Sequence, residues 1–154
     1  MAVQLTREVA QLLREPETVK ALATVDENGN PQVVIKQTIH LAADGQIVYL
    51  ELLESSRTNK NMIRSLWFDR KVAVVIKGKD GNSYQILGRP VRAIITGPVF
   101  EKYYTEVRQK LGDVDLATVW KIKPESIINE SFPVRKTQEE ERHPIFTHLD
   151  RIAR

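Results

Sequence analysis

Short runs of strand-forming residues alternate with clusters of turn residues along most of the chain. Val19–Val25 and Gln32–Ile39 are rich in β-branched and apolar residues, and Asp26–Pro31 between them is a turn cluster. This arrangement predicts a hairpin. A second turn at Ala42–Gly45 leads into a third predicted strand over Ile47–Leu53.

The second half of the chain repeats the pattern. It predicts three further strands: Val72–Lys77, Ser83–Thr96 and Leu116–Lys123. An aspartate-glycine turn within Lys79–Asn82 joins the first two as a hairpin. Gly88 and Pro90 interrupt the long strand, which indicates an edge position or a bulge, and Pro124 is expected to end the last strand.

Three helices are predicted around these strands. Apolar residues recur at helical spacing over Leu5–Leu13, a capping segment precedes Thr58–Leu66, and Gly97-Pro98 opens a longer helix that Gly112 closes. On the longer helix the predicted apolar face consists of Phe100, Tyr104, Val107 and Leu111, which leaves Tyr103 without a role. Strands that follow one another as hairpins favour a small closed barrel over a parallel α/β fold.

Composition narrows the class of protein. A chain of 154 residues fits one domain, and 23 basic against 20 acidic residues give a dispersed net charge of +3 that is no nucleic-acid footprint. There are no cysteines, which excludes disulfides and thiolate chemistry. Neither a secretory leader nor an apolar run of the ~20 residues that cross a membrane is visible, so we expect a cytoplasmic protein without membrane contact.

A cluster of hydroxyl and basic side chains stands where the third strand gives way to a helix. The hydroxyls belong to Ser55, Ser56 and Thr58, and the cations are Arg57 and Lys60. Helix-start amides, hydroxyls and cations together are what a phosphate group requires. The alternative is a serine-capped surface helix with solvated basic residues.

The order of these elements resembles the pyridoxamine 5′-phosphate oxidase-like family of FMN-binding split barrels. The resemblance covers roughly Leu5 to Pro124, and the following segments carry it together with the serine and basic helix start: Ala21–Val25, Pro31–Lys36, Gly45–Leu50, Arg70–Val74 and the strand that contains Gly88. It implies a mainly β fold with flanking helices, a six-stranded antiparallel split β-barrel over residues 1–154. It also implies flavin mononucleotide (FMN) as cofactor and a homodimer whose two chains share each site.

The resemblance also implies which residues contact the flavin. Those expected beside the ring are Val33, Val34, Ile35 and Lys36. Tyr49 and Leu50 are expected along the ribityl chain. Those expected at the phosphate are Ser56, Arg57, Thr58 and Lys60.

The chain departs from the oxidase proper at several places. Gln32 replaces an arginine, Thr58 replaces a lysine, and residues from Phe132 onward lack the C-terminal arginine and tryptophan signature. Pyridoxamine phosphate is therefore not predicted as the substrate, and no catalytic residue is assigned.

Three functions stay open. The first is a flavin-dependent oxidoreductase acting on a small molecule, with a nicotinamide as one option for the reductant. The second is a flavin-binding or flavin-sensing protein without turnover. The third, a single-stranded nucleic-acid-binding barrel, is disfavoured because aromatic residues make up only 6% of the chain. A deazaflavin or heme in place of FMN also stays open.

The last segment, residues 132–154, is expected to pack on the barrel or on the partner chain. Ile145, Phe146, Leu149 and Ile152 form an apolar stripe after Pro144. The preceding run 135–142 is wholly polar and reads as a solvated linker. His143 and His148 lack the spacing of a helical metal pair, so no metal site is predicted.

Overall fold

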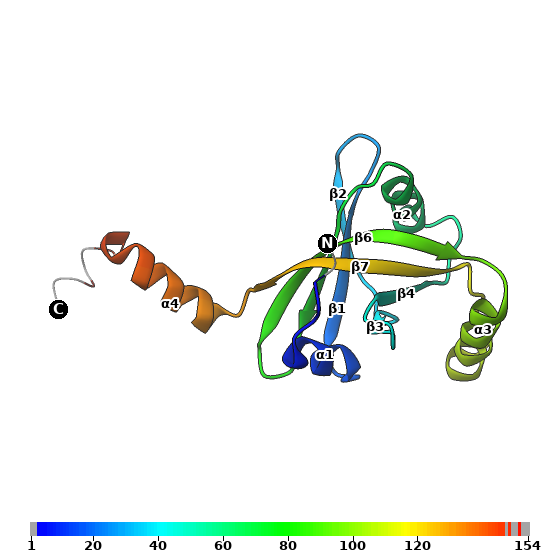
Figure 1. Cartoon of the computed structure of the whole chain (residues 1–154), viewed down its shortest axis with the longest axis horizontal. Helices are drawn as coiled ribbons and strands as arrows, with labels where there is room; N and C mark the ends of the chain where they lie inside the picture. The colour runs from blue at the N-terminus through cyan, green and yellow to red at the C-terminus, as the bar shows by residue number, and fades with distance from the viewer. Residues whose placement is uncertain (1–2, 147, 149–150, 152–154) are drawn as a thin grey trace.

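The body of the protein is one curled antiparallel sheet of seven strands (Figure 1). The computed structural model describes residues 3–146, 148 and 151. The strands are β1 Val19–Val25, β2 Pro31–Ile35, β3 His40–Leu41, β4 Ile47–Glu51, β5 Val72–Lys77, β6 Ser83–Ile94 and β7 Thr118–Asn129. Their order is β2-β1-β5-β6-β7-β4-β3, with antiparallel pairing throughout.

The predicted mainly β fold with flanking helices is confirmed, and the curled sheet is consistent with a split barrel. The count of six strands is wrong, because β3 adds a seventh that pairs with β4 through His40 and Leu41 only. Two residues are too few to show the alternation by which a strand is recognised in a sequence.

The long strands β6 and β7 bend around each other through two irregularities, next to Gly88 and Pro90. A side chain at Gly88 would meet the carbonyl oxygen of Lys123 at 2.6 Å, so glycine is needed where the two backbones approach. The expectation that Pro124 ends the last strand is wrong. Pro124 lies opposite Gly88 at a bulge, and β7 continues beyond it to Asn129.

Two helices close the open ends of the curled sheet. Helix α1, Arg7–Arg14, starts at Thr6, whose hydroxyl accepts a hydrogen bond from the Val9 amide. Helix α2, Arg57–Trp67, starts at Ser56 and lies against β1 and β6. The indole nitrogen of Trp120 in β7 donates to Asn59 of α2 at 2.9 Å, which ties the helix to the fully buried centre of the barrel.

Helix α3, Pro98–Leu111, packs on the sheet with a face that agrees with the predicted one at Phe100 and Val107 only. Val107 is buried, and Phe100 and Tyr103 pack beside it, whereas Tyr104 and Leu111 are exposed. The stripe 100, 103, 107 has helical spacing as good as the predicted one, so the periodicity could not separate them. Tyr103 thus gains a structural position that the sequence did not assign.

The polar run at the end of the chain is helix α4, Phe132–Arg142, rather than a linker. It extends away from the barrel, no residue of it is buried, and a short 3₁₀ turn over Pro144–Phe146 follows (Figure 1). Ile145 and Phe146 are exposed, and Leu149 and Ile152 lie outside the described residues. The described part of the tail therefore does not pack on its own barrel, which leaves the partner chain as the remaining expectation.

Across the described part of the chain, no helix combines the length and the apolar content that crossing a bilayer requires.

Candidate functional site

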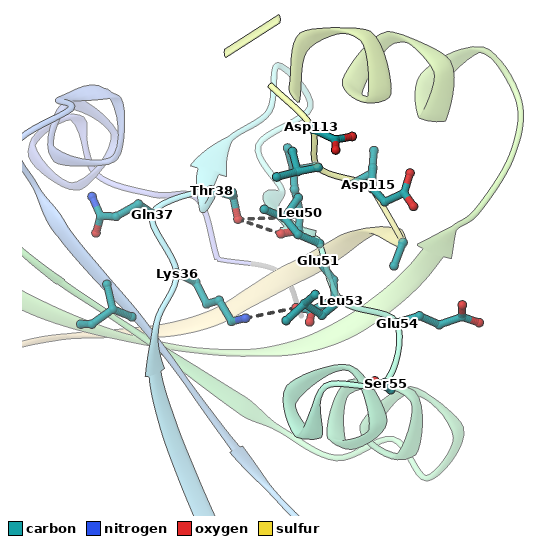
Figure 2. Close-up of a pocket in the computed structure, with 15 residues that line it drawn as sticks. Lys36, Gln37, Thr38, Leu50, Glu51, Leu53, Glu54, Ser55, Asp113 and Asp115 are labelled. Carbon is teal, nitrogen blue, oxygen red and sulfur yellow. Dashed lines mark hydrogen bonds and ion pairs between the residues drawn. The ribbon is translucent and has the colours of Figure 1, made fainter. Parts of the chain in front are cut away.

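A large cavity opens where β2 and β4 end beside the segment that follows α3 (Figure 2). Its volume is about 1260 Å³. Ile35 and Lys36 contribute one wall, Leu50 to Ser55 a second, and residues 113–117 a third. Strands β2 and β4 are far apart in the order of the sheet, so the curl of the sheet is what brings these walls together.

A buried carboxylate organises the polar side of this cavity. Glu51, the last residue of β4, is completely buried, and its side chain accepts hydrogen bonds from Lys36 Nζ at 3.2 Å and from the Ser56 hydroxyl. The Ser56 hydroxyl oxygen also accepts from the Asn59 amide at 3.0 Å as the cap of α2. Both oxygens of the carboxylate are thus held, and the ion pair with Lys36 balances its charge.

Glu51 is a site residue that the sequence analysis missed. The available signal was a charged residue directly following the apolar run Ile47–Leu50. A glutamate in such a position is rarely buried unless it is paired, and its partner Lys36 lies fifteen positions away in sequence.

Thr38 fixes the wall between β2 and β4. Its hydroxyl donates to the Leu50 carbonyl at 2.9 Å and accepts from the Leu50 amide at 3.2 Å, as Figure 2 shows. The neighbouring Gln37 side chain accepts from the Lys20 amide and donates to the Thr18 carbonyl. These side chains replace backbone pairing where the chain leaves β2, so the cavity has a rigid rear wall.

Only some of the residues predicted beside the flavin ring and the ribityl chain line the large cavity. Ile35, Lys36 and Leu50 line the large cavity. The Tyr49 ring is buried in the barrel core, with Lys36 Nζ 5.4 Å from its centroid. Val34 is half-buried, and Val33 is exposed on the outer face of the sheet.

The residues predicted at the phosphate do not lie in one cavity. The Ser56 hydroxyl donates to Glu51, which lines the large cavity. Thr58 is buried, and its hydroxyl accepts a hydrogen bond from the Gln32 side chain at 3.4 Å. Arg57 and Lys60 are exposed and line a smaller neighbouring cavity together with Arg64. The cations thus stand on the outer side of the α2 start rather than inside the large cavity.

Two acidic side chains, Asp113 and Asp115, border the side of the large cavity that lies next to α3 (Figure 2). Glu54 lies beside Ser55, near the start of α2, with its side chain exposed. Asp113 is 3.6 Å from Arg108, and both side chains are solvent-exposed, so this pair weakens the local negative charge only slightly. An anionic group in the cavity is therefore favoured near α2 and disfavoured near residues 113–115.

His143 stacks on Phe146 in the tail, with ring centroids 4.5 Å apart. Over residues 3–146, 148 and 151, no three His, Cys, Asp or Glu side chains come together as a metal ligand set.

No protein-family model and no curated protein matches the sequence. Solved structures do match. HupZ from Group A Streptococcus aligns with 84% of this chain and 96% of its own, at 20% identity and a TM-score of 0.68. A candidate pyridoxamine 5′-phosphate oxidase from Lactobacillus delbrueckii aligns with 81% of this chain and 93% of its own, at 25% identity and a TM-score of 0.62.

An FMN-binding protein from Syntrophomonas wolfei aligns with 82% of this chain and 88% of its own, at 15% identity and a TM-score of 0.63. Similar structures at 15% and 14% identity also include an F420 reductase and HutZ, the heme storage protein of Vibrio cholerae. These proteins differ in the cofactor that their names state and share the fold. The chain shares the split-barrel fold of pyridoxamine 5′-phosphate oxidase-like and FMN-binding proteins.

Proposed function

We propose that the protein binds FMN in the large cavity, as a homodimer, and acts as a flavin-dependent oxidoreductase on a small molecule. The observation that carries the proposal is the convergence of Ile35, Lys36 and Leu50 on one cavity beside the start of α2. Its volume of about 1260 Å³ exceeds the ~300–1,000 Å³ of a typical small-molecule pocket, which leaves room for a partner chain to complete the walls.

The residues present fit a phosphorylated flavin. Among the described residues, no acceptor bonds the backbone amides of Arg57 and Thr58, the first two of α2, so both are available to a phosphate. Since the Lys36 ammonium already balances the Glu51 carboxylate, the charge for the phosphate comes from Arg57 and Lys60. The acidic border at residues 113–115 favours the same orientation.

This orientation gives each group a role. The phosphate lies at the start of α2, where Arg57 and Lys60 reach it from the outer side. Leu50 lies along the ribityl chain, and Ile35 and Lys36 lie beside the ring. When bound, the flavin ring supplies hydride and electron transfer. The Lys36 ammonium, paired with Glu51, would donate a hydrogen bond to the ring from this wall.

Calorimetry with FMN and riboflavin tests the proposal. FMN should bind more tightly than riboflavin, and Arg57→Ala and Lys60→Ala should each weaken FMN about tenfold while riboflavin is unchanged, since a hydrogen bond to a charged group contributes ~1.5–3 kcal/mol. Lys71→Ala, an exposed cation beyond α2, is the matched control. Failure of the folded protein to bind any flavin would refute the proposal. Tighter binding of heme or of a deazaflavin than of FMN would show that this other molecule is the cofactor.

The outer face of the sheet suits a second copy of the chain. Val33 and Ile35 of β2 are 67% and 61% exposed. In register beside them lie small or apolar residues of the next two strands, Ala21, Ala23, Ala73 and Val75. Directly opposed residues share one face of a sheet, so the six form a continuous apolar surface, which we propose as the dimer interface.

Val33→Asp tests this interface. It should convert the dimer into a monomer in light scattering and weaken FMN, because a carboxylate would be buried without a partner. Val99→Asp, at an exposed position of α3, should leave the dimer intact. A wild-type monomer that holds FMN would refute the shared site.

We also propose that the tail packs on the partner chain. Phe132, Ile145 and Phe146 are exposed apolar side chains that the barrel of the same chain does not cover. Truncation after Ser131 should therefore lower the melting temperature and weaken dimerisation. No change in either would refute this packing.

A further inference from the structure

A second cavity lies on the other side of the wall formed by Gln37, Thr38 and Leu50. It is bordered by α1, the start of β1, β3 and α3, and its volume is about 520 Å³. This is the size of a small-molecule pocket. Six apolar side chains contribute to its lining: Leu13, Ile39, Leu41, Leu50, Val107 and Leu111.

A buried lysine lines this apolar cavity. Lys20 of β1 is only 6% exposed, and among the described residues no hydrogen bond or ion pair reaches its ammonium group. Its backbone amide donates to Gln37 at 2.9 Å, which holds the residue in place. A lysine that is largely buried and has no partner is costly to ionise, and burial lowers the pKa of Lys20. Because the chain supplies no counter-charge at this position, an anionic ligand could pair with the Lys20 ammonium.

The remaining charges around the cavity do not supply that partner. Arg14 and Lys110 line it as exposed cations, and Glu106 is the carboxylate among its described lining residues. Glu106 forms no ion pair with Lys20 within 4.0 Å. Three cations therefore face one anion, and the cavity has an excess of positive charge.

His40 and Tyr103 form a neutral pair in the cavity wall. His40 Nδ1 is 2.8 Å from the Thr38 carbonyl, to which it can only donate, so Nε2 accepts from the Tyr103 hydroxyl at 2.9 Å. Burial is the main cause that lowers the pKa of His40, which keeps the ring neutral at pH 7. Both polar groups are satisfied within the chain, and Lys20 is the largely buried cation of the described lining that has no partner.

We propose that this cavity binds a small amphipathic anion, a carboxylate with an unbranched apolar chain. The carboxylate pairs with the Lys20 ammonium, and the apolar chain lies against the leucine and isoleucine side chains between α1 and α3. The pairing provides the Lys20 ammonium with a counter-charge, and the apolar lining removes the chain of the ligand from water. This site is separate from the proposed flavin cavity and does not depend on flavin binding.

Octanoate and octan-1-ol are the probes for the test, because they share a chain length and differ in charge. Calorimetry on the full-length protein should show octanoate binding, weakened at least about tenfold by Lys20→Met, with octan-1-ol bound equally by both proteins. Lys79→Met, whose exposed ammonium pairs with Glu17 at 3.3 Å, should bind octanoate as the wild type does. Methyl NMR should show shifts at Leu13, Ile39 and Val107.

The stability of unliganded Lys20→Met provides a second readout. Methionine keeps the length of the side chain and removes the buried charge, so the melting temperature should rise by about 2–4 °C. A lower melting temperature would show that Lys20 serves the fold rather than a ligand. That result, no octanoate binding, or equal octanoate affinity in wild type and Lys20→Met would each overturn the proposal.

Discussion

The two cavities that share the wall of Gln37, Thr38 and Leu50 treat a buried charge in opposite ways. In the larger cavity the Glu51 carboxylate is balanced by Lys36 and Ser56 of the same chain. In the smaller cavity the Lys20 ammonium has no partner among the described residues.

The difference separates structural charge from charge that is available to a ligand. A balanced pair holds two segments in one arrangement, and removing one partner leaves the other buried and uncompensated. An unbalanced charge reduces stability in the free protein and gains from an external counter-ion. Substitutions at Lys36 and at Lys20 should therefore change stability with opposite sign.

Lys36→Met should produce the largest effect. It leaves the Glu51 carboxylate fully buried with the Ser56 hydroxyl as its remaining partner, and the free energy of unfolding should fall by about 3 kcal/mol in urea denaturation. Lys121→Met is the control, since Lys121 pairs at 2.6 Å with an Asp44 side chain that is half exposed, and it should cost about 1 kcal/mol or less. A similar loss of stability for both variants would mean that the buried ion pair of Lys36 is worth no more to the fold than the partly exposed pair of Lys121.

Thr38→Val tests the shared wall and should have the next largest effect. Valine has the same shape but cannot bond the Leu50 amide and carbonyl, so both backbone groups lose a partner and stability should fall by about 2 kcal/mol. Thr105→Val removes an exposed hydroxyl that donates to the Glu101 carbonyl and should change stability by about 0.5 kcal/mol at most. An equally small loss at Thr38 would mean that packing alone holds the wall.

Tyr103→Phe should have a smaller effect than Thr38→Val. It removes the hydrogen bond to His40 but keeps the ring, so about 1 kcal/mol of stability should be lost. Tyr104→Phe, one position along α3 and exposed, is the matched control and should be neutral. Equal stability of the two variants would mean that the hydrogen bond between Tyr103 and His40 does not stabilise the fold.

The pH dependence of stability should show the smallest effect. Because burial lowers the pKa of His40 in the folded chain below its ordinary value of 6.5, the unfolded chain binds a proton first as the pH falls. The contribution of His40 to stability is thus complete well above pH 6.5 and is lost as the pH falls below it. Urea midpoints from about pH 7 to about pH 5 should fall more for the wild type than for His40→Gln. His143→Gln, at an exposed position, should follow the wild type.

Local pattern was sufficient for most of the fold. The hairpin of β1 and β2, the start of α2 at Ser56 and the interruptions at Gly88 and Pro90 were all predicted, because each depends on residues close in sequence. The short strand β3 and the continuation of β7 through Pro124 were not predicted, since both depend on a partner strand. The packing face of α3 was wrong for a related reason, because two stripes of similar spacing compete and the sheet selects one.

The sequence by itself was sufficient for the fold class and for part of the lining of the larger cavity, namely Ile35, Lys36 and Leu50. It could not determine that Glu51 takes Lys36 and Ser56 as partners, nor that Lys20 and His40 meet Tyr103 around a second cavity. The members of both groups are separated by up to 83 positions, between Lys20 and Tyr103, and they meet through the curl of the sheet. Whether a buried charge is balanced depends on the distance between side chains in three dimensions, and only the tertiary structure decides that distance.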